Sequence, residues 1–491
     1  MPDLASSSPV PPEIDLRPAL RLRGAVAEVA DGVAHLVGLT DVGSEELVQL
    51  DSGALGMAYE IAAERTGIVL LEGGDGVRAG DGAVALGRLP SISAGPELLG
   101  RVVNPLGAPL DARPPPRGTV RALFREAPPL TARAPVERPL HTGIMAIDTA
   151  IPIGRGQRQL VIGDRNVGKT ALVLDVIAAQ RPGDVACVYV VIGQPISRAL
   201  GIREALERAG ALSNTVIVAS DAADPAGLQY LAPYAGAAVA ESFRDEGRDA
   251  LVVYDDLTKH ADAYRELALL LGRPPGREAF PGDIFYIHAE LLERATALAA
   301  GGSVTAFPIV ETTDSDISSY IPTNLISITD GQVYLDSGRF ERNQRPAIDI
   351  GRSVSRVGGT AQVRALRAAS RNLRIVMSRF EALEALTRVG LDVDAPTRKA
   401  IERGRITREA LRQPRFSVRS LADQVLAMTA IDEGWLDGVP LDDVGSVLWS
   451  AAAAVGEVLP DLGRAFEIGT PPADWKERAR DQIARRRGPR P

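Results

Sequence analysis

The sequence predicts a multidomain α/β chain with a small N-terminal β-barrel, a central domain built on a parallel β-sheet, and a C-terminal helical domain. Its 491 residues are too many for one ordinary hydrophobic core. Its apolar residues follow three patterns in turn: short alternating runs between glycine turns, near-continuous runs separated by helical stretches, and recurrence at helical spacing. We expect a disordered tail and three domains, with boundaries at residues 1–20, 21–90, 91–359 and 360–491.

The first part of the sequence combines a polar tail with closely spaced strands. Residues 1–20 are rich in Pro and Ser, a composition that buries too little apolar surface to order the backbone. From about Arg21 to Arg88, brief alternating segments are separated by glycine turns, which favours a small β-barrel. A proline-rich connector follows at about residues 107–120.

The central part, from about Pro139 to Ile350, alternates apolar runs with helical patterns. Near-continuous apolar strands separated by helices are typical of a parallel sheet that is covered on both faces. The expected strands are the runs "RQLVIG", "VACVYVVIG", "NTVIVAS", "DALVVYDD", "GSVTAFPIV" and "LISITDG".

Beyond Gly359 the apolar residues recur at helical spacing, so we expect an all-helical domain. The sequence ends in "WKERARDQIARRRGPRP", a basic and proline-terminated stretch. We interpret this stretch as a solvated, frayed helix end, with a docking arm as the alternative.

Composition excludes several classes of protein. The net charge of −8 is unfavourable for sequence-independent nucleic-acid binding, so we expect no nucleic-acid partner. No apolar run approaches the roughly 18 residues of a membrane span, and no apolar leader opens the sequence. Cys187 is the single cysteine, which indicates a reducing compartment without disulfides. The four histidines are scattered and show no metal-ligand spacing.

One motif carries chemistry. Residues 163–170 read "GDRNVGKT", which fits the phosphate-loop pattern G-x-x-x-x-G-K-[ST] between an expected strand and an expected helix. Gly163 and Gly168 let backbone N–H groups turn toward phosphates, Lys169 supplies a point charge, and Thr170 offers a hydroxyl to Mg²⁺. Only four of the 55 basic residues are lysines, and one of them stands in this loop. The central domain is therefore expected to be a P-loop nucleotide-binding domain.

Such sites also use a carboxylate at the end of a neighbouring strand. The run "DALVVYDD" ends in Asp255 and Asp256. We assign Mg²⁺ binding, together with Thr170, to Asp255, and expect Asp256 to cap the following helix.

Over nearly its whole length the sequence resembles the alpha-subunit family of F-type ATP synthases. The stretches that carry the resemblance include "ELLGRVVNPLGAPLD", "TGIMAIDTAIPIGRGQRQLVIGDRNVGKT", "LQYLAPYAG", "YDDLTKHADAYRELALLLGRPPGREAFPGDIFYIHAELLERA", "SSYIPTNLISITDGQVYL" and "RPAIDIGRSVSRVGGTAQ". The resemblance implies a RecA-like P-loop core and bound MgATP or MgADP. It also implies an alpha3beta3 hexamer with catalytic beta subunits, a gamma central stalk and peripheral-stalk subunits. The membrane would be met only through the Fo sector, at the cytoplasmic face of a bacterial inner membrane.

The resemblance also implies roles for individual residues. Arg356 matches the arginine finger that enters the neighbouring beta subunit's site, and Ser353 matches a nearby position needed for activity. Gln194 stands where catalytic relatives have the glutamate that activates water, and an amide cannot accept that proton. The remaining expected nucleotide-binding residues are Asp164, Arg165, Asn166 and Val167 in the loop, and Phe340, Arg345, Pro346, Gln413 and Arg415 around the base.

Several positions depart from the family pattern and suggest a divergent branch. Asn166 and Val167 stand where the family commonly has Gln and Thr, Arg415 where it usually has Gln, and "GQPISRALG" lacks the usual basic stretch. Two alternatives stay open at this point. One is a catalytic rotary or export ATPase subunit, which Gln194 disfavours. The other is a hexameric RNA helicase, which the lack of Trp and Phe in the barrel segment disfavours.

Overall fold

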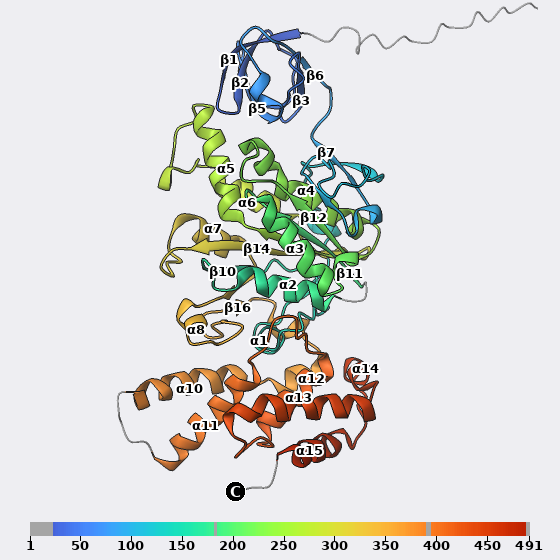
Figure 1. Cartoon of the computed structure of the whole chain (residues 1–491), viewed down its shortest axis with the longest axis vertical. Coiled ribbons are helices and arrows are strands. Elements are labelled where there is room, and N and C mark those ends of the chain that lie inside the picture. The colour runs from blue at the N-terminus through green and yellow to red at the C-terminus, as the bar shows by residue number, and fades with distance from the viewer. Residues whose placement is uncertain (1–22, 181–183, 389–393, 488–491) are drawn as a thin grey trace, which may run out of the picture. The chain divides into compact units, whose positions relative to one another are not determined.

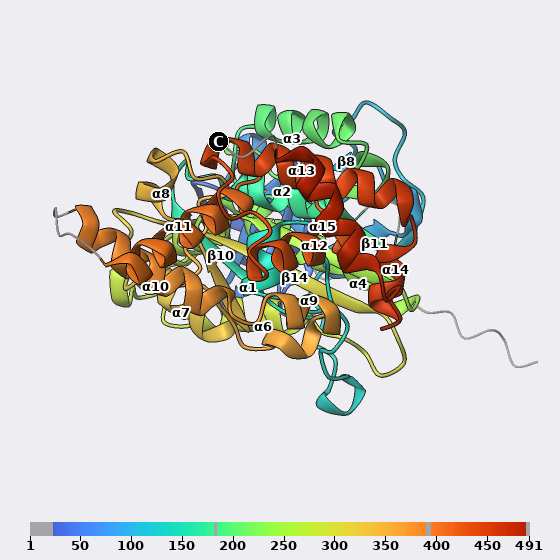
Figure 2. The ribbon, with the colours of Figure 1, turned by 90° about the horizontal axis from the view of Figure 1, so that it is seen from below.

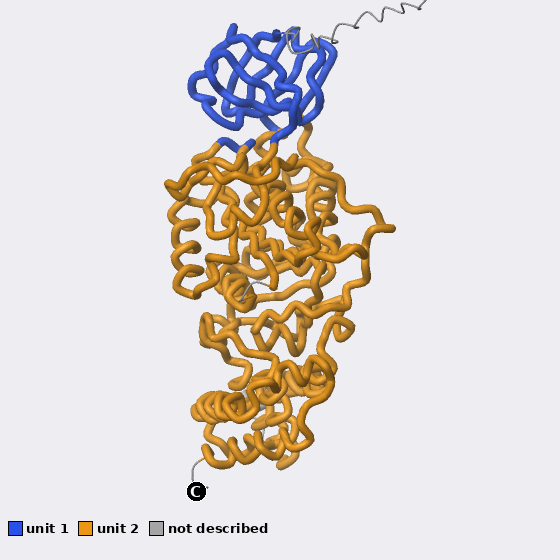
Figure 3. Tube along the Cα trace, turned by 90° about the vertical axis from the view of Figure 1, so that its right-hand side faces the viewer, with its two compact units in different colours: residues 1–90, 225–227, 269–272 blue, residues 91–224, 228–268, 273–491 orange. Residues whose placement is uncertain are grey.

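The computed structural model describes residues 23–180, 184–388 and 394–487, so the expected disordered tail at 1–20 lies outside the described residues. The protein divides into two compact units (Figure 3). The first is built on residues up to 90 with the short segments 225–227 and 269–272, and the second comprises the rest.

The first unit is a closed six-stranded barrel in the order β1-β2-β5-β4-β3-β6, which confirms the predicted barrel. Glycine turns separate its strands, and residues such as Leu36, Val48 and Ile68 fill its interior. Bulges between Val26 and Glu28 and in β4 help the sheet to curve shut. The strands are β1 (Arg23–Ala30), β2 (Val33–Val37), β3 (Leu47–Leu50), β4 (Leu55–Ile61), β5 (Thr66–Glu72) and β6 (Gly82–Ala85).

The second unit contains an eight-stranded sheet in the order β16-β15-β10-β14-β13-β11-β12-β8, in which only the β15–β16 pairing is antiparallel. Every residue of β11, β12 and β13 is buried, as a sheet covered on both faces requires. The strands are β8 (Val102–Val103), β10 (Leu160–Asp164), β11 (Val185–Val191), β12 (Thr215–Ala219), β13 (Asp249–Asp255), β14 (Ser303–Thr312), β15 (Gly331–Tyr334) and β16 (Val354–Ser355). A separate ribbon pairs β7 (Ser91–Ala94) with β9 (Thr119–Ala122).

Helices surround this sheet (Figure 1). They are α1 (Met145–Ala150), α2 (Lys169–Ala179), α3 (Ile196–Arg208), α4 (Ala226–Asp245), α5 (Leu257–Leu270), α6 (Ile284–Glu293), α7 (Tyr320–Ile328) and α8 (Ser337–Glu341). Five of the six predicted strands are present, but the assignment of "LISITDG" to a strand was wrong. Its first four residues end α7, because Ile321, Asn324 and Leu325 are buried at helical spacing, and the strand β15 begins only at Gly331.

The C-terminal part is helical, as predicted. Its helices are α9 (Arg364–Ala369), α10 (Leu373–Arg388), α11 (Ala395–Ala410), α12 (Leu421–Asp432), α13 (Leu441–Val458), α14 (Leu462–Glu467) and α15 (Trp475–Arg486). Helix α12 is buried on nearly every face and contacts α9, α11, α13, α14 and α15 (Figure 2). A reciprocal capping box between Ser420 and Asp423 fixes its start.

The prediction of a solvated, frayed terminal helix was wrong for the described residues of that stretch. Helix α15 buries Trp475, Ala479 and Ile483 along one face, and Trp475 packs edge-on against Phe466. In the sequence, the charged residues between these three positions hid the apolar face of the helix. Among the helices of the described ranges, none combines the length and the apolarity that a membrane crossing demands.

Candidate functional site

The phosphate loop connects β10 to α2, as the motif requires. Gly163 has no room for a side chain, since a Cβ there would lie 2.6 Å from the carbonyl oxygen of Leu335. Gly168 precedes α2 with φ at 99° and Asn166 has φ at 62°, both in the left-handed region. The loop therefore turns back on itself and presents the N-terminus of an eleven-residue helix to the space in front of it.

Lys169 is held by the loop's own backbone. Its Nζ donates to the carbonyl oxygens of Gly163 at 2.8 Å and Asp164 at 2.6 Å, and it lies 3.7 Å from Glu311 Oε1. Burial lowers the pKa of Lys169, and the carboxylates of Glu311, Asp256 and Asp255 oppose that change. The ammonium is thus placed at the start of α2 by contacts within this protein.

Asp164 anchors the loop rather than facing the space in front of it. Its carboxylate accepts hydrogen bonds from Thr312 Oγ1 at 2.6 Å, from Ser337 Oγ at 2.6 Å, and from both the N–H and the hydroxyl of Ser315. Although burial acts in the opposite direction, these hydrogen bonds lower the pKa of Asp164 to about 2. The side chain fastens the end of β10 to β14 and α8.

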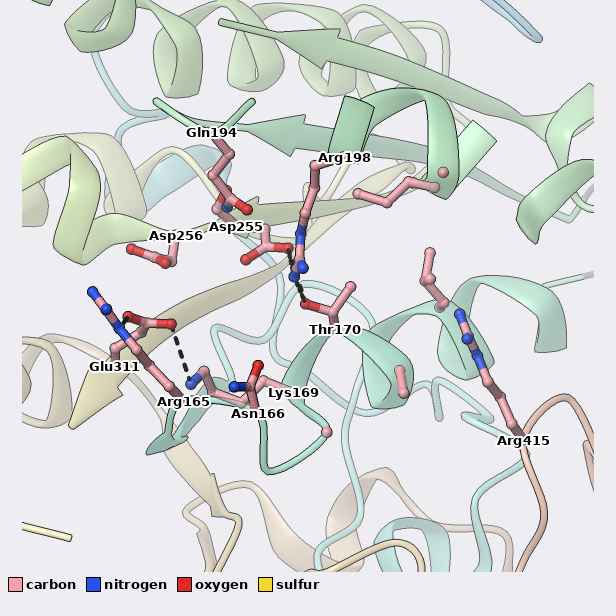
Figure 4. Close-up of a pocket in the computed structure, with 15 residues that line it drawn as sticks. Arg165, Asn166, Lys169, Thr170, Gln194, Arg198, Asp255, Asp256, Glu311 and Arg415 are labelled. Carbon is pink, nitrogen blue, oxygen red and sulfur yellow. Dashed lines mark hydrogen bonds and ion pairs between the residues drawn. The ribbon is translucent and has the colours of Figure 1, made fainter. Parts of the chain in front are cut away.

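A cavity of about 570 Å³ opens in front of the loop (Figure 4). We call it the phosphate-loop cavity. Its walls contain eight of the predicted binding residues, the predicted helix cap Asp256, and residues to which the sequence analysis assigned no role. The eight are Arg165, Asn166, Gly168, Lys169, Thr170, Gln194, Asp255 and Arg415, and the residues without a predicted role include Arg198 and Glu311.

Thr170 and Asp255 meet in this cavity. Thr170 Oγ1 donates to Asp255 Oδ2 at 3.2 Å, and the buried Tyr189 hydroxyl donates to the same oxygen at 2.5 Å. Burial and the negative charge of Asp255 raise the pKa of Tyr189. A hydroxyl and a carboxylate side by side form the oxygen donor set that Mg²⁺ prefers, so these two residues fit the metal.

Asp256 has a different task from Asp255. Its Oδ1 accepts a hydrogen bond of 2.8 Å from the backbone N–H of Lys259 at the start of α5, as the capping interpretation expected. Burial and the nearby charge of Asp255 raise the pKa of Asp256 to about 7.

Gln194 follows β11 and reaches over the end of β13. Its Nε2 donates to the backbone oxygen of Asp255 at 2.8 Å, which fixes the amide in the cavity wall. Glu311, at the end of β14, is a carboxylate in the same cavity. Each of its oxygens faces a cation, with Arg165 Nε at 2.9 Å and Lys169 Nζ at 3.7 Å.

Arg198 in the first turn of α3 was missed by sequence reasoning. Its Nη2 donates to Thr170 Oγ1 at 2.6 Å and lies 3.8 Å from Asp255 Oδ2. Figure 4 shows the guanidinium reaching between these two side chains. The departure of "GQPISRALG" from the family pattern was the one signal in the sequence that could have drawn attention to this arginine.

A smaller cavity of about 90 Å³ is also lined by residues of α2 and shares Gly168, Ala171 and Arg415 with the first. We call it the Phe340 cavity. Arg345 stacks on the Phe340 ring at 3.9 Å, and Val167, Pro346 and Gln413 are also part of the wall. The Gln413 amide is engaged by the protein, since Nε2 donates to the oxygens of Gly143 and Ser417. The predicted base-binding residues are therefore brought together in one place.

Arg356 and Ser353 lie away from both cavities. Arg356 is exposed just after β16, and its Nη2 contacts the carbonyl oxygen of Ile326 at 3.4 Å. Ser353 is fully buried; its hydroxyl donates to Asp349 O at 2.6 Å and accepts from Tyr334 N at 2.9 Å. Ser353 thus fastens the turn from which Arg356 projects.

Three family models cover most of the sequence. The beta-barrel domain of the ATP synthase alpha/beta family matches residues 21–87, and the nucleotide-binding domain of the same family matches residues 143–355. The C-terminal domain of the ATP synthase alpha/beta chain matches residues 362–471.

Similar proteins share almost half of their residues with this one. ATP synthase subunit alpha 1 of Chlorobium luteolum is 46% identical over 477 residues, which cover 96% of this protein and 93% of that one. ATP synthase subunit alpha 2 of Syntrophus aciditrophicus is 47% identical, with 91% and 87% covered. ATP synthase subunit alpha of Petrotoga mobilis is 47% identical, with 86% and 85% covered.

Proposed function

Because the chain belongs to the ATP synthase alpha/beta family, and within it to the alpha subunits of F-type ATP synthases, we propose that it holds MgATP with little turnover and lends Arg356 to a neighbouring catalytic beta subunit. In this proposal it alternates with beta subunits in an alpha3beta3 hexamer around a gamma central stalk. Peripheral-stalk subunits and the Fo sector connect the hexamer to the cytoplasmic face of a bacterial membrane.

The observation that carries the non-catalytic role is the amide of Gln194. A general base must accept a proton from the attacking water, and an amide cannot do so. Gln194 is also held by Asp255 O at 2.8 Å, so it forms part of the wall. The carboxylates around it are committed: Asp255 to Thr170 and Tyr189, and Asp256 to the start of α5.

Binding of the nucleotide is divided between the two cavities. Lys169 and the N-terminus of α2 face the phosphates, and Thr170 with Asp255 would hold Mg²⁺, which draws negative charge from the phosphate oxygens when bound. Phe340, with Arg345 stacked on it, offers an aromatic face to the base.

The exposed position of Arg356 supports its role in a neighbour's site. A guanidinium that lines neither cavity of its own subunit does not act on its own nucleotide, whereas one that projects from a buried, hydrogen-bonded turn can be presented across an interface. A guanidinium stabilises the charge that develops on transferring phosphoryl oxygens.

Substitution of Arg356 tests the proposal. In the assembled complex, Arg356→Ala should lower steady-state ATP hydrolysis by on the order of 10³-fold or more, because a positioned arginine of this kind contributes that much. Assembly and ATP binding by the isolated subunit should be unchanged. Arg364→Ala, which removes an exposed arginine at the start of α9, is the matched control. Normal turnover in the Arg356 variant would overturn the finger assignment.

A catalytic subunit is the second candidate, and Glu311 is the observation that favours it, since it places a carboxylate in the phosphate-loop cavity. Hydrolysis by the purified protein without partners distinguishes the two candidates. Rapid MgATP turnover that Glu311→Gln abolishes would support the catalytic candidate and contradict the holding role.

A further inference from the structure

Arg198 places a positive charge where the oxygen donors for a metal converge. Its guanidinium donates to Thr170 Oγ1 at 2.6 Å and lies 3.8 Å from Asp255 Oδ2, and these two oxygens are 3.2 Å apart. The same two groups form the donor set that fits Mg²⁺. The arginine is therefore a competitor and a substitute for a divalent cation at this point.

The other cations in the walls of the phosphate-loop cavity, within the described ranges, have different partners. Arg165 pairs with Glu311 at 2.9 Å, and Lys169 is bound to the carbonyl oxygens of Gly163 and Asp164. Arg415 lies over the ring of Phe416, 4.7 Å from its centroid. The charge beside Thr170 therefore comes from Arg198.

The chemistry of the guanidinium suits this place. Its planar fork can donate two hydrogen bonds to phosphate oxygens. The Arg198 side chain is 44% exposed, so its end is free to turn from Thr170 toward a phosphate in the cavity. Its base is fixed in the first turn of α3, where Arg198 N donates to Pro195 O at 2.8 Å.

We propose that Arg198 supplies, beside Thr170 and Asp255, the positive charge that a phosphate-loop site otherwise takes from Mg²⁺, so that this subunit holds ATP with only a weak dependence on divalent cation. The inference rests on the proposed nucleotide-binding role of the loop. When Mg²⁺ is present, the metal and the guanidinium compete for the same oxygens, and the gain from the metal is small. When Mg²⁺ is removed, Arg198 still neutralises the terminal phosphates.

Equilibrium binding of ATP to the purified full-length protein tests the proposal, with excess Mg²⁺ in one arm and excess EDTA in the other. The Kd of the natural protein should rise by less than about tenfold on removal of Mg²⁺. The Kd of Arg198→Ala should rise by about 100-fold, because a charge-assisted hydrogen bond lost without compensation is worth about 10- to 100-fold in affinity.

Two further variants sharpen the test. Arg203→Ala removes an arginine of the same helix that pairs with Glu207 at 3.8 Å on the surface, and should behave as the natural protein does. Arg198→Lys keeps the charge without the fork and should give an intermediate dependence on Mg²⁺.

The outcomes that overturn the inference are distinct from failure of the proposed function. If the natural protein loses as much affinity in EDTA as Arg198→Ala does, the inference is wrong, although the protein still binds nucleotide. If the natural protein binds no ATP in either arm, the nucleotide-holding role fails and the inference fails with it. The comparison of the natural protein in the two arms needs no variant to fold.

Discussion

Asp175 on α2 carries a carboxyl group into the wall of the Phe340 cavity, where it accepts a hydrogen bond of 2.9 Å from Phe416 N. Burial raises the pKa of Asp175 from 3.8 to about 6, against the opposing effects of that hydrogen bond and of Arg415. Because the folded state binds this proton more tightly than the unfolded state does, stability falls as the pH rises from about 4 to about 6. Above that range the charged carboxylate lowers the free energy of unfolding by at most about 3 kcal/mol.

Substitution of Asp175 by an uncharged isostere should remove this cost. Asp175→Asn keeps an acceptor for Phe416 N and should stabilise the protein more at about pH 8 than at about pH 5. The gain in the free energy of unfolding should differ by roughly 1 kcal/mol between the two pH values, and the apparent melting temperature should rise accordingly. Thermal unfolding followed by circular dichroism at both pH values measures it. Asp175→Ala, which loses the acceptor, is the comparison, and an equal gain at both pH values would contradict the assignment.

At this scale the sequence predicted the residues with a motif and missed those without one. The loop, Thr170 and Asp255 follow from a spacing that phosphate chemistry imposes. Arg198 and Glu311 are brought to the cavity by α3 and β14. Their contribution depends on how these elements are placed in the sheet, and no local pattern records that placement.

Helices α5 and α6 are joined by two buried histidines. His260 Nδ1 and His288 Nε2 share a hydrogen bond of 3.2 Å, and His260 stacks on Tyr230 with 5.2 Å between centroids. Burial lowers the pKa of His288 from 6.5 to about 3, and burial together with His288 lowers that of His260. Below pH 6.5 the unfolded state binds protons that the folded state excludes, so stability is lost as the pH falls from about 6.5 toward 3.

Replacement of His288 should make this pair of helices less sensitive to acid. At about pH 5, protonation of the His288 side chain in the unfolded state lowers the free energy of unfolding by about 2 kcal/mol. Glutamine in His288→Gln can still hydrogen-bond to His260 but cannot be protonated. The variant should therefore lose less melting temperature between about pH 8 and about pH 5 than the natural protein does, because one of the two histidines that cause the loss has been removed. A variant that shows the same acid sensitivity as the natural protein would show that the pair does not control it.

Elements were predicted well where one periodicity was clear. The fully buried strands β11 and β13 read as continuous apolar runs, and the motif located β10 and α2. The prediction of a strand at Leu325–Ile328 was wrong because a short apolar run fits a strand as well as a buried helix end. The prediction of a solvated helix α15 was wrong because three apolar residues among many charges do not reveal the surface on which they pack.

For the molecule as a whole, the division into barrel, parallel-sheet domain and helical domain followed from composition and periodicity, and the family models match the same three parts. The participation of the protein in a larger ATPase could not be derived in that way, because the other subunits of such a complex leave no pattern in the composition or periodicity of this sequence.

In the assembled complex the holding site and the finger should be separable. Lys169→Ala should weaken ATP retention by this subunit, because a charged hydrogen-bond donor to phosphate is lost, by about 10- to 100-fold in Kd. Turnover of the complex should fall much less than in Arg356→Ala, since in the proposed division of labour the Lys169 site takes no part in the catalytic step. The two variants are compared by bound nucleotide after gel filtration and by steady-state hydrolysis. Equal losses of turnover would contradict the division of labour.

The closed barrel affects how the protein behaves before it is assembled into a complex. Each of its six strands is paired along both sides, with β1 against β6 completing the circle. A free strand edge would template pairing with other copies and lead to aggregation. The N-terminal units of newly synthesised copies therefore offer one another no free strand edge for intermolecular pairing. This protects a subunit of a larger complex from aggregation before it is assembled.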